Sequence, residues 1–252
     1  MSQGTAPPSV HLRSARLTYG GVRLFDGLDL DLPSGQWISL LGPSGVGKTT
    51  VLRMVAGLVQ PEPPTTMAAG DSTPLAGRIA WMGQQDLLLP WLSVRDNVTL
   101  GDRLRGTRTD AAGMARASRL LQRVGLADEA TARPAALSGG MRQRVALART
   151  LYEDRPLVLM DEPFSAVDAI TRLRLQDLAA ELLAGRTVLL VTHDPLEALR
   201  LSDRVLVLSG RPVRLSPPLL PPGPAPRAVD DPGLLALQGQ LLARLAAAEV
   251  GS

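Results

Sequence analysis

The chain has 252 residues, of which 45% are hydrophobic and 20% are charged, with a net charge of +3. This balance is typical of a folded globular protein and excludes disorder as the dominant state. The absence of cysteine excludes a disulfide framework, a zinc–thiolate site and a cysteine nucleophile, and the two histidines are too few for a histidine-built metal site. The small positive excess is scattered and does not indicate a nucleic-acid partner.

Strand patterns dominate the first third of the chain. Apolar and polar residues alternate over much of the first forty positions, most regularly at 28–32, which predicts half-buried antiparallel strands. Trp37–Leu41 predicts a short buried strand, and residues 48–57 predict a helix that Gly57 ends. We expect irregular backbone over 58–78 and a strand over 78–82.

A helical stretch follows, and then strands and helices alternate. Helix patterns are clearest at 111–124 and 141–152. Beyond them we predict strands at 157–160, 187–192 and 204–208, and helices at 166–183 and 195–201. Continuous apolar strands between helices predict a parallel sheet with both faces covered. The chain ends with a Pro-rich stretch (216–226) and an apolar helix (233–250), which we expect to pack on the sheet.

The segment between the buried strand and the following helix matches the phosphate-binding pattern G-x-x-x-x-G-K-[ST]. Glycines let backbone N–H groups converge on phosphate oxygens, and the helix N-terminus adds its positive end. Lys48, the only lysine in the chain, can place a compact charge on the β- and γ-phosphates, while the Thr49 hydroxyl can bind Mg²⁺. The predicted nucleotide-binding residues are Gly42, Pro43, Ser44, Gly45, Val46, Gly47, Lys48, Thr49 and Thr50.

Two carboxylates, Asp161 and Glu162, follow the apolar strand at 157–160. Ligands of open α/β sheets bind at the carboxyl ends of strands. We therefore expect Asp161 to hold the metal and Glu162 to polarise the attacking water as a general base. Taken alone, the pair is equally compatible with a solvated strand end.

A second anion site is predicted at residues 137–144, here called the signature segment. Ser138 can cap the following helix, and Gly139 and Gly140 leave backbone amides bare at its N-terminus. Since one nucleotide does not need two phosphate cradles, this one is best explained as serving a nucleotide held by another copy of the chain. A plain capped helix after a glycine turn is the alternative.

In this order, these segments resemble the ATP-binding subunits of ABC transporters over nearly the whole chain. The resemblance implies a P-loop NTPase (RecA-like) α/β core with an antiparallel β subdomain and an inserted helical subdomain, binding ATP and Mg²⁺. It also implies that Ser138 and Gly140 bind the γ-phosphate of the ATP on the opposite subunit and that Asp168 bridges the dimer.

The same resemblance implies roles for three further residues. Tyr19 would stack on adenine, Gln84 would touch Mg²⁺ and the attacking water and couple to the permease, and His193 would contact the γ-phosphate. Each also has a plainer interpretation. Tyr19 lies in a Tyr-Gly-Gly turn, Gln84 is followed by a second glutamine, and a lone histidine after a strand is usually structural.

Residues 84–98 are similar to the corresponding stretch of the nitrate, sulfonate and taurine importers. Residues 84–91 also look like the branch associated with the pyrimidine precursor of thiamine. We therefore predict a homodimeric importer ATPase, peripheral on the cytoplasmic face of the cell membrane, with a separate permease and, indirectly, a periplasmic binding protein. The alternatives are a soluble ABC-type ATPase of DNA repair or translation, and an exporter ATPase.

Within one domain over 1–252, we expect the nucleotide-binding core and β subdomain at 1–84 and 155–210, the helical subdomain at 85–154, and an appended segment at 211–252. Residues 87–91, here called the docking segment, consist of three leucines, a proline and Trp91. The segment follows Gln84 after two intervening residues, Gln85 and Asp86. Leaving so much apolar surface in water is costly, at ~25 cal/mol per Å². We expect this segment to line a groove for a cytoplasmic helix of the permease, with local packing as the alternative.

Overall fold

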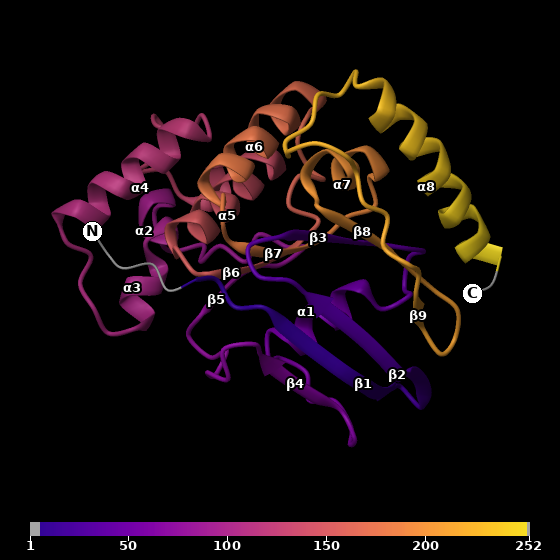
Figure 1. Ribbon diagram of the computed structural model, residues 1–252. Helices are drawn as coiled ribbons and strands as arrows, with labels where there is room; N and C mark the ends of the chain where they lie inside the picture. Colours follow the sequence, from indigo (N-terminus) through magenta and orange to yellow (C-terminus); the bar gives the residue numbers. More distant parts are fainter. Residues whose placement is uncertain (1–5, 251–252) are drawn as a thin grey trace. The chain divides into compact units, whose positions relative to one another are not determined.

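The computed structural model describes residues 6–250 (Figure 1). Residue contacts divide the described chain into two compact units. The first contains the described residues as far as Ile79, then Pro156–Asp161 and the residues from Ala184 onward; the second contains Ala80–Arg155 and Glu162–Leu183. The domain limits expected from the sequence stay predictions, and residues 1–5 and 251–252 of that domain lie outside the described residues.

An antiparallel sheet with the order β2-β1-β4 opens the first unit. Strands β1 (Val10–Tyr19) and β2 (Val22–Leu32) pair with Leu12 opposite Leu30, and their inward side chains are buried as the alternation predicts. Strand β4 (Thr66–Ala69) contradicts the expectation of irregular backbone over 58–78. It is an edge strand whose only buried residue is Ala69, so its sequence shows no apolar alternation.

The second sheet of this unit carries the parallel strands. Its order within the unit is β6-β7-β3-β8-β9, and β9 alone runs antiparallel to its neighbour. The strands are β3 (Trp37–Leu41), β6 (Leu157–Asp161), β7 (Thr187–Val191), β8 (Arg204–Ser209) and β9 (Arg214–Leu215). Strands β3, β6 and β7 are buried along their whole length, as their continuous apolar sequences predict.

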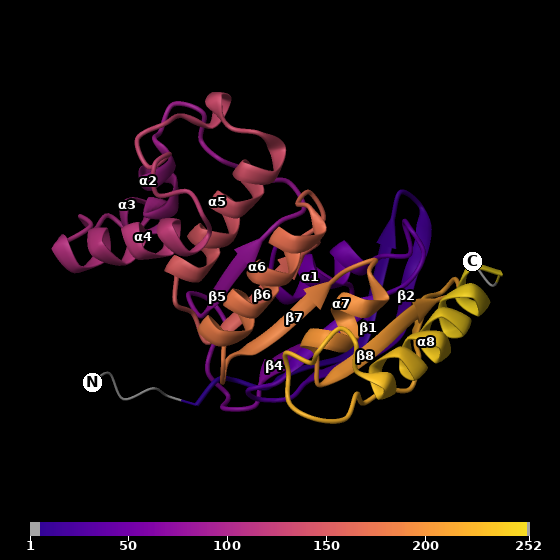
Figure 2. The same cartoon turned by 90° about the horizontal axis from the view of Figure 1, so that it is seen from above.

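Helices cover both faces of this parallel sheet (Figure 1). Helix α1 (Lys48–Val55) lies on one face, and α7 (Pro195–Leu201) and α8 (Pro232–Val250) lie on the other. Leu234 and Leu241 of α8 join a buried cluster with residues of α7 and β8, which confirms that the C-terminal helix packs on the sheet (Figure 2). Strand β5 (Ile79–Met82) spans the boundary between the two units.

The buried Arg227 holds the Pro-rich connection before α8. Its guanidinium donates hydrogen bonds to the carbonyl oxygens of Leu199 and Ser202 at 2.8 and 3.0 Å, and to those of Pro221, Pro222 and Gly223 at 2.7 to 2.8 Å. Burial lowers the pKa of Arg227, against the opposing charges of Asp203 and Asp231. One charged side chain thus satisfies the carbonyls of a segment that has little regular structure.

The second unit is helical (Figure 2). Its α-helices are α2 (Val94–Val98), α3 (Leu100–Leu104), α4 (Ala111–Arg123), α5 (Gly139–Tyr152) and α6 (Ala169–Leu182), with a short 3-10 turn, η1 (Pro134–Ala136). Side chains of Ser93, Asp110, Ser138 and Asp168 cap α2, α4, α5 and α6. The predicted helices at 111–124 and 141–152 are confirmed, although α5 begins earlier, at Gly139. No helix within residues 6–250 is long and apolar enough to cross a membrane.

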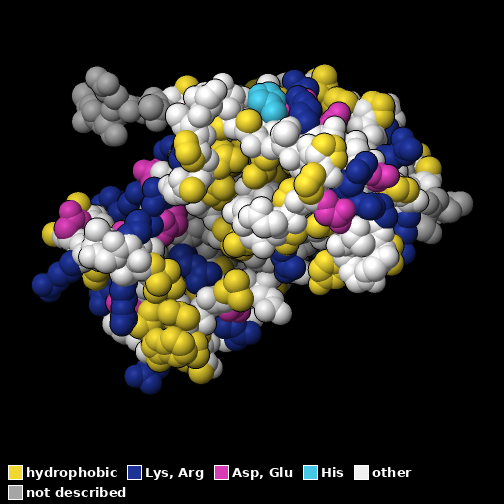
Figure 3. Space-filling model, turned by 90° about the horizontal axis from the view of Figure 1, so that it is seen from below, with side chains coloured by type: hydrophobic (Ala, Val, Ile, Leu, Met, Phe, Trp, Pro, Cys, Tyr) yellow, Lys and Arg dark blue, Asp and Glu magenta, His cyan; other side chains and the backbone are white. Residues whose placement is uncertain are grey.

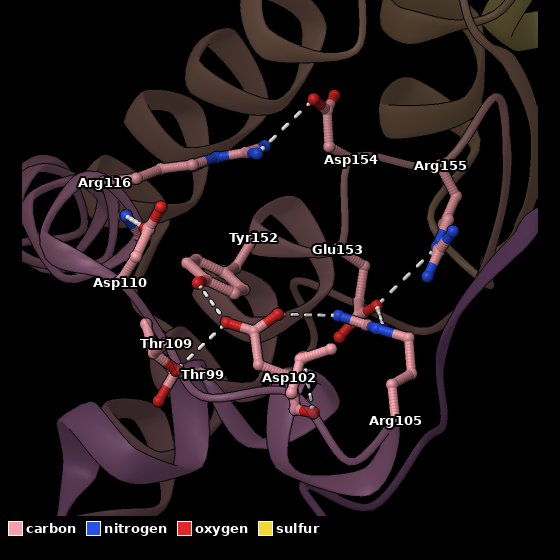
Figure 4. Close-up of polar contacts among 12 residues, drawn as sticks. Thr99, Asp102, Arg105, Thr109, Asp110, Arg116, Tyr152, Glu153, Asp154 and Arg155 are labelled. Carbon is pink, nitrogen blue, oxygen red and sulfur yellow. Dashed lines mark hydrogen bonds and ion pairs between the residues drawn. The ribbon is translucent and has the colours of Figure 1, made fainter.

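A polar network ties α3 to the end of α5 (Figure 4). The Asp102 carboxylate accepts hydrogen bonds from the Tyr152 hydroxyl at 2.6 Å, from Thr109 at 3.0 Å and from Arg105 at 2.9 Å. Arg105 also donates to Glu153 at 2.6 Å. Burial, together with the bond to Asp102, raises the pKa of Tyr152 to about 12. The neutral phenol therefore acts as a donor within the second unit.

Candidate nucleotide-binding site

The phosphate-binding loop connects β3 to α1 in the first unit. Gly42 has a φ of 146°, and a Cβ there would lie 2.5 Å from the carbonyl oxygen of Leu208. Gly47 has a φ of 110°, and its Cβ would lie 3.0 Å from Cζ of Phe25. Backbone conformation and packing both demand glycine at these positions. Helix α1 begins without a side-chain cap, which leaves its first N–H groups available to an anion.

Lys48 folds back over this loop. Its Nζ donates hydrogen bonds to the carbonyl oxygens of Gly42 at 2.7 Å and of Pro43 at 2.9 Å. These bonds place the ammonium charge at the mouth of the loop, where a phosphate group bound by the loop amides would meet it.

Thr49 and Asp161 meet at the end of β6. The Thr49 hydroxyl donates to Oδ2 of Asp161 at 2.7 Å, and Asp161 is only 2% exposed. Burial raises the pKa of the Asp161 carboxyl, while the Thr49 bond and the charges of Arg53 and Lys48 act in the opposite direction. A hydroxyl and a carboxylate are hard oxygen donors, and Mg²⁺ commonly binds one or two carboxylates together with substrate phosphates. These side chains therefore fit Mg²⁺, although no group of three or more His, Cys, Asp or Glu gathers in the described part of the chain.

Glu162 is the first residue of the second part of the second unit, Glu162–Leu183. Its backbone conformation is left-handed, with a φ of 53°. This conformation costs a non-glycine residue roughly 1–2 kcal/mol. Its carbonyl oxygen accepts hydrogen bonds from Nε2 of Gln143 at 2.8 Å and from the Ser165 hydroxyl at 3.0 Å. Such strain, held by surrounding bonds, is typical of functional positions.

Gln143 is a positioning residue to which the sequence alone assigned no role. It is buried in α5, and besides holding Glu162 it accepts a hydrogen bond from the Ala166 amide at 2.7 Å. The available signal was an amide side chain on the buried face of a helix. Its partners, 19 and 23 residues away in the sequence, could not be read from the local pattern.

The signature segment contains the N-terminus of α5. The Ser138 hydroxyl accepts a hydrogen bond from the Met141 amide at 3.3 Å, which confirms the predicted cap. A Cβ on Gly140 would lie 2.8 Å from the carbonyl oxygen of Ala166, so packing explains this glycine. A Cβ on Gly139 would meet nothing nearer than an Arg142 nitrogen at 3.9 Å. Packing within the chain does not require glycine at position 139.

The remaining predicted residues have exposed side chains. Tyr19 ends β1 and is 71% exposed, Gln84 follows β5, and His193 follows β7. Tyr19, the loop, Asp161 and His193 belong to the first unit; Gln84, the signature segment and Glu162 belong to the second. The structure thus joins Thr49 to Asp161 and Lys48 to its own loop. The roles of the other residues stay predictions.

The docking segment is partly packed and partly exposed. Leu88 is buried, whereas Leu87 and Trp91 are 57% and 65% exposed. The fully buried Asn97 fixes the segment by accepting from the Leu89 amide at 2.7 Å and donating to the Leu89 carbonyl at 3.1 Å. Hydrophobic side chains gather on the surface of the second unit in Figure 3, toward the lower left. Exposed large hydrophobic residues of this unit include Leu87, Trp91, Leu104 and Ile170.

The parallel sheet, the glycine loop before α1 and the carboxylate at the end of β6 define a P-loop NTPase, with an antiparallel β sheet and a helical unit added to the core. A family model described as "ABC transporter" matches residues 25–165, and the chain belongs to this family. The predicted fold and family are therefore confirmed, and the chain is an ATP-binding ABC subunit with ATPase activity.

Relatives and a solved structure agree with this assignment. An uncharacterized ABC transporter ATP-binding protein of Haemophilus influenzae is 47% identical over 239 residues, covering 94% of this chain and 98% of the relative. The aliphatic sulfonates import ATP-binding protein SsuB 1 of Pseudomonas syringae is 45% identical, covering 95% and 97%. A dimeric ATP-binding cassette, solved in a post-hydrolysis state with ADP and Pi, matches with a TM-score of 0.74 and 28% identity, covering 85% of this chain and 99% of that one.

Proposed function

We propose that this chain is the ATP-hydrolysing subunit of an importer, acting as a homodimer at the cytoplasmic face of the cell membrane beneath a separate permease. A periplasmic binding protein would deliver the solute. The observation that carries the proposal is the phosphate-binding loop with Thr49 bonded to the buried Asp161. Relatives named for aliphatic sulfonate import support a small sulfonate-like solute.

In this proposal the loop amides and Lys48 hold the β- and γ-phosphates of ATP. Thr49 and Asp161 are the oxygen donors for Mg²⁺, which when bound neutralises phosphate charge and orients the leaving group. The Thr49–Asp161 hydrogen bond keeps both donors facing each other. Tyr19, with its exposed ring at the end of β1, is available to stack on adenine.

Glu162 accepts the proton of the attacking water, and the strained backbone held by Gln143 orients its side chain for this step. We assign His193 to the γ-phosphate. Gln84 is assigned to Mg²⁺, to the attacking water and to coupling with the permease. Each of these roles is testable by substitution, because all three side chains extend from turns or strand ends.

The signature segment serves the nucleotide held by the second copy. Gly139 supports this role because packing within the chain leaves space for a side chain at this position. A nucleotide phosphate that approaches the start of α5 closely would fill that space. Ser138 and the first amides of α5 supply hydrogen-bond donors there.

The test is a Glu162→Gln variant examined by gel filtration with and without MgATP. Glutamine keeps the shape and removes the base, so ATP binds, turnover stops, and a dimer accumulates. Glu181→Gln is the matched control, since Glu181 pairs with Arg123 at the surface of the second unit and its substitution should leave turnover unchanged. A Glu162→Gln protein that stays monomeric with ATP and hydrolyses it normally contradicts the proposal.

The solute is tested separately, by uptake of a labelled aliphatic sulfonate into cells with and without the gene. Loss of uptake in the deletion supports the sulfonate assignment. The sequence of residues 84–91 favours the pyrimidine precursor of thiamine as the second candidate, and labelled precursor distinguishes the two. A deletion that alters neither uptake nor any membrane transport favours a soluble ABC-type ATPase.

A further inference from the structure

Arg142 bridges two segments of the second unit. Its Nε lies 3.0 Å from Oδ2 of Asp86, and its Nη1 donates to the carbonyl oxygen of Leu137 at 2.9 Å. Asp86 comes directly before the docking segment, and Leu137 comes directly before Ser138. One guanidinium therefore connects the two places that the proposed function assigns to different partners.

Arg149, two helical turns further along α5, contacts backbone carbonyl groups of Asp86 and of the docking segment. Its guanidinium donates to the carbonyl oxygens of Asp86 at 2.6 Å and of Leu87 at 2.9 Å. Burial lowers the pKa of Arg149, while the charge of Asp86 opposes this effect. Asp86 and the start of the docking segment are thus held to α5 through the Asp86 carboxylate and the carbonyl groups of Asp86 and Leu87.

The Arg142 contact has a geometry that only arginine provides. A planar guanidinium offers donors in several directions, so it can hold a carboxylate and a carbonyl at once, whereas a lysine ammonium on its flexible stem acts as a point charge. The Asp86 and Arg142 side chains are 30% and 37% exposed, and exposed pairs contribute little to stability. Stability alone therefore explains this bridge poorly.

We infer that Asp86 and Arg142 are positioning residues that link the docking segment to the Ser138 end of α5, so that partner docking and ATP engagement influence each other. The inference rests on the proposed function, in which Ser138 meets the nucleotide of the second copy. Coupling between two sites is reciprocal. Engagement of Ser138 by ATP must therefore be felt at residues 86–91 even without a permease.

Hydrogen exchange of peptides covering residues 84–92 tests this link in the free protein. The parent is the Glu162→Gln variant, compared with and without MgATP. Because engagement of Ser138 orders the linked residues, ATP should slow exchange in this segment at least about five-fold. Asp86→Ala and Arg142→Lys should each remove most of the slowing while dimer formation continues. The double variant should lose no more than either single variant.

Two further variants separate coupling from general damage. Asp86→Glu keeps the carboxylate and should restore most of the slowing, and Glu181→Gln breaks a surface ion pair elsewhere in the unit and should change nothing. Thermal unfolding verifies that each variant is folded. If the variant of one residue, Asp86 or Arg142, fails to fold, the exchange measured in the variant of the other residue tests the link.

The outcomes distinguish the two proposals. If no dimer forms with MgATP, the proposed function fails. If the dimer forms but exchange at 84–92 does not respond to ATP, or if ATP slows this exchange in Asp86→Ala and Arg142→Lys as much as in the parent, the link is wrong. If Arg142→Lys alone keeps the full response, charge rather than bridging carries it, and the inference in this form is overturned.

Discussion

The Thr49 hydroxyl lies 2.7 Å from Oδ2 of Asp161, a residue 112 positions later in the chain. This one hydrogen bond joins the helix that follows the phosphate-binding loop to the carboxyl end of β6. Because ligands of open α/β sheets bind at such strand ends, the contact sets the proposed oxygen donors for Mg²⁺ beside the predicted phosphate position.

Magnesium binding should depend on the protonation of Asp161. Burial raises the pKa of this carboxyl, so it takes up a proton at a higher pH than an exposed aspartate does. The folded apo-protein is therefore relatively more stable with Asp161 protonated, and this contribution is lost as pH rises through the raised pKa. Conversely, Mg²⁺ affinity should fall as pH is lowered through the same range.

Titration of Mg²⁺ into the ATP complex from about pH 8 to about pH 5 measures this effect. Asp161→Asn should weaken Mg²⁺ binding at every pH and reduce its dependence on pH to the part that comes from protonation of the nucleotide's own terminal phosphate, whose second pKa is about 6. An unchanged Mg²⁺ affinity in Asp161→Asn would exclude this carboxylate as a ligand.

Two neighbouring glycines should respond oppositely to alanine. Gly140→Ala places a Cβ 2.8 Å from a backbone oxygen and should destabilise the fold by roughly 1–3 kcal/mol. Gly139→Ala has free space and improves helix propensity, so its thermal unfolding should be unchanged or slightly improved. ATP-dependent dimerisation should nevertheless fall at least about tenfold in Gly139→Ala. Normal dimerisation of that variant would mean that no nucleotide approaches the signature segment.

Alkaline stability should report the Tyr152–Asp102 bond (Figure 4). The folded protein holds the phenol proton more tightly, with a pKa of about 12 against an ordinary 10.0. The resulting stability is fully present below pH 10 and is lost as pH rises toward 12. Tyr152→Phe should lack this component of the decline. Urea unfolding at several alkaline pH values measures it, and parallel curves for wild type and variant would refute it.

Substitutions in the docking segment should separate packing from partner binding. Leu88→Ala truncates a buried side chain and should cost about 2–3 kcal/mol of unfolding free energy. Trp91→Ala truncates a side chain that is 65% exposed and should change this free energy by less than about 0.5 kcal/mol. Association with the permease and transport should weaken in Trp91→Ala. If Trp91→Ala unfolds the free subunit, or leaves transport by the reconstituted complex unchanged, the hypothesis that the docking segment lines a groove for the permease is wrong.

Much of this architecture could be predicted because the signals are local. Alternation of apolar residues gave β1 and β2, continuous apolar stretches gave β3, β6 and β7, and a capping serine gave the start of α5 to within one or two residues. The phosphate-binding loop is contiguous, so its residue types and spacing are visible together. Lys48 was distinctive as the only lysine in the chain.

What could not be predicted depends on contacts that form only on folding. Strand β4 is an exposed edge strand specified by its pairing with β1 rather than by its own pattern. Gln143 is hydrogen-bonded to Glu162, which lies 19 residues away in the sequence, and Arg142 is bonded to Asp86, which lies 56 residues away. Local sequence records the presence of these polar side chains but not their partners. The role of Arg227 was hidden for the same reason.

The most direct test of the nucleotide site is equilibrium binding of labelled ATP with Mg²⁺ to the wild type, Lys48→Ala and Lys48→Arg. Lys48→Arg is the matched control for charge, because its planar guanidinium keeps the charge but differs from the compact ammonium that caps the loop. Loss of charge-assisted bonds should weaken ATP binding at least about tenfold in both variants, with folding unchanged. Unchanged ATP affinity in Lys48→Ala would contradict the assignment of residues 42–50 as the nucleotide site.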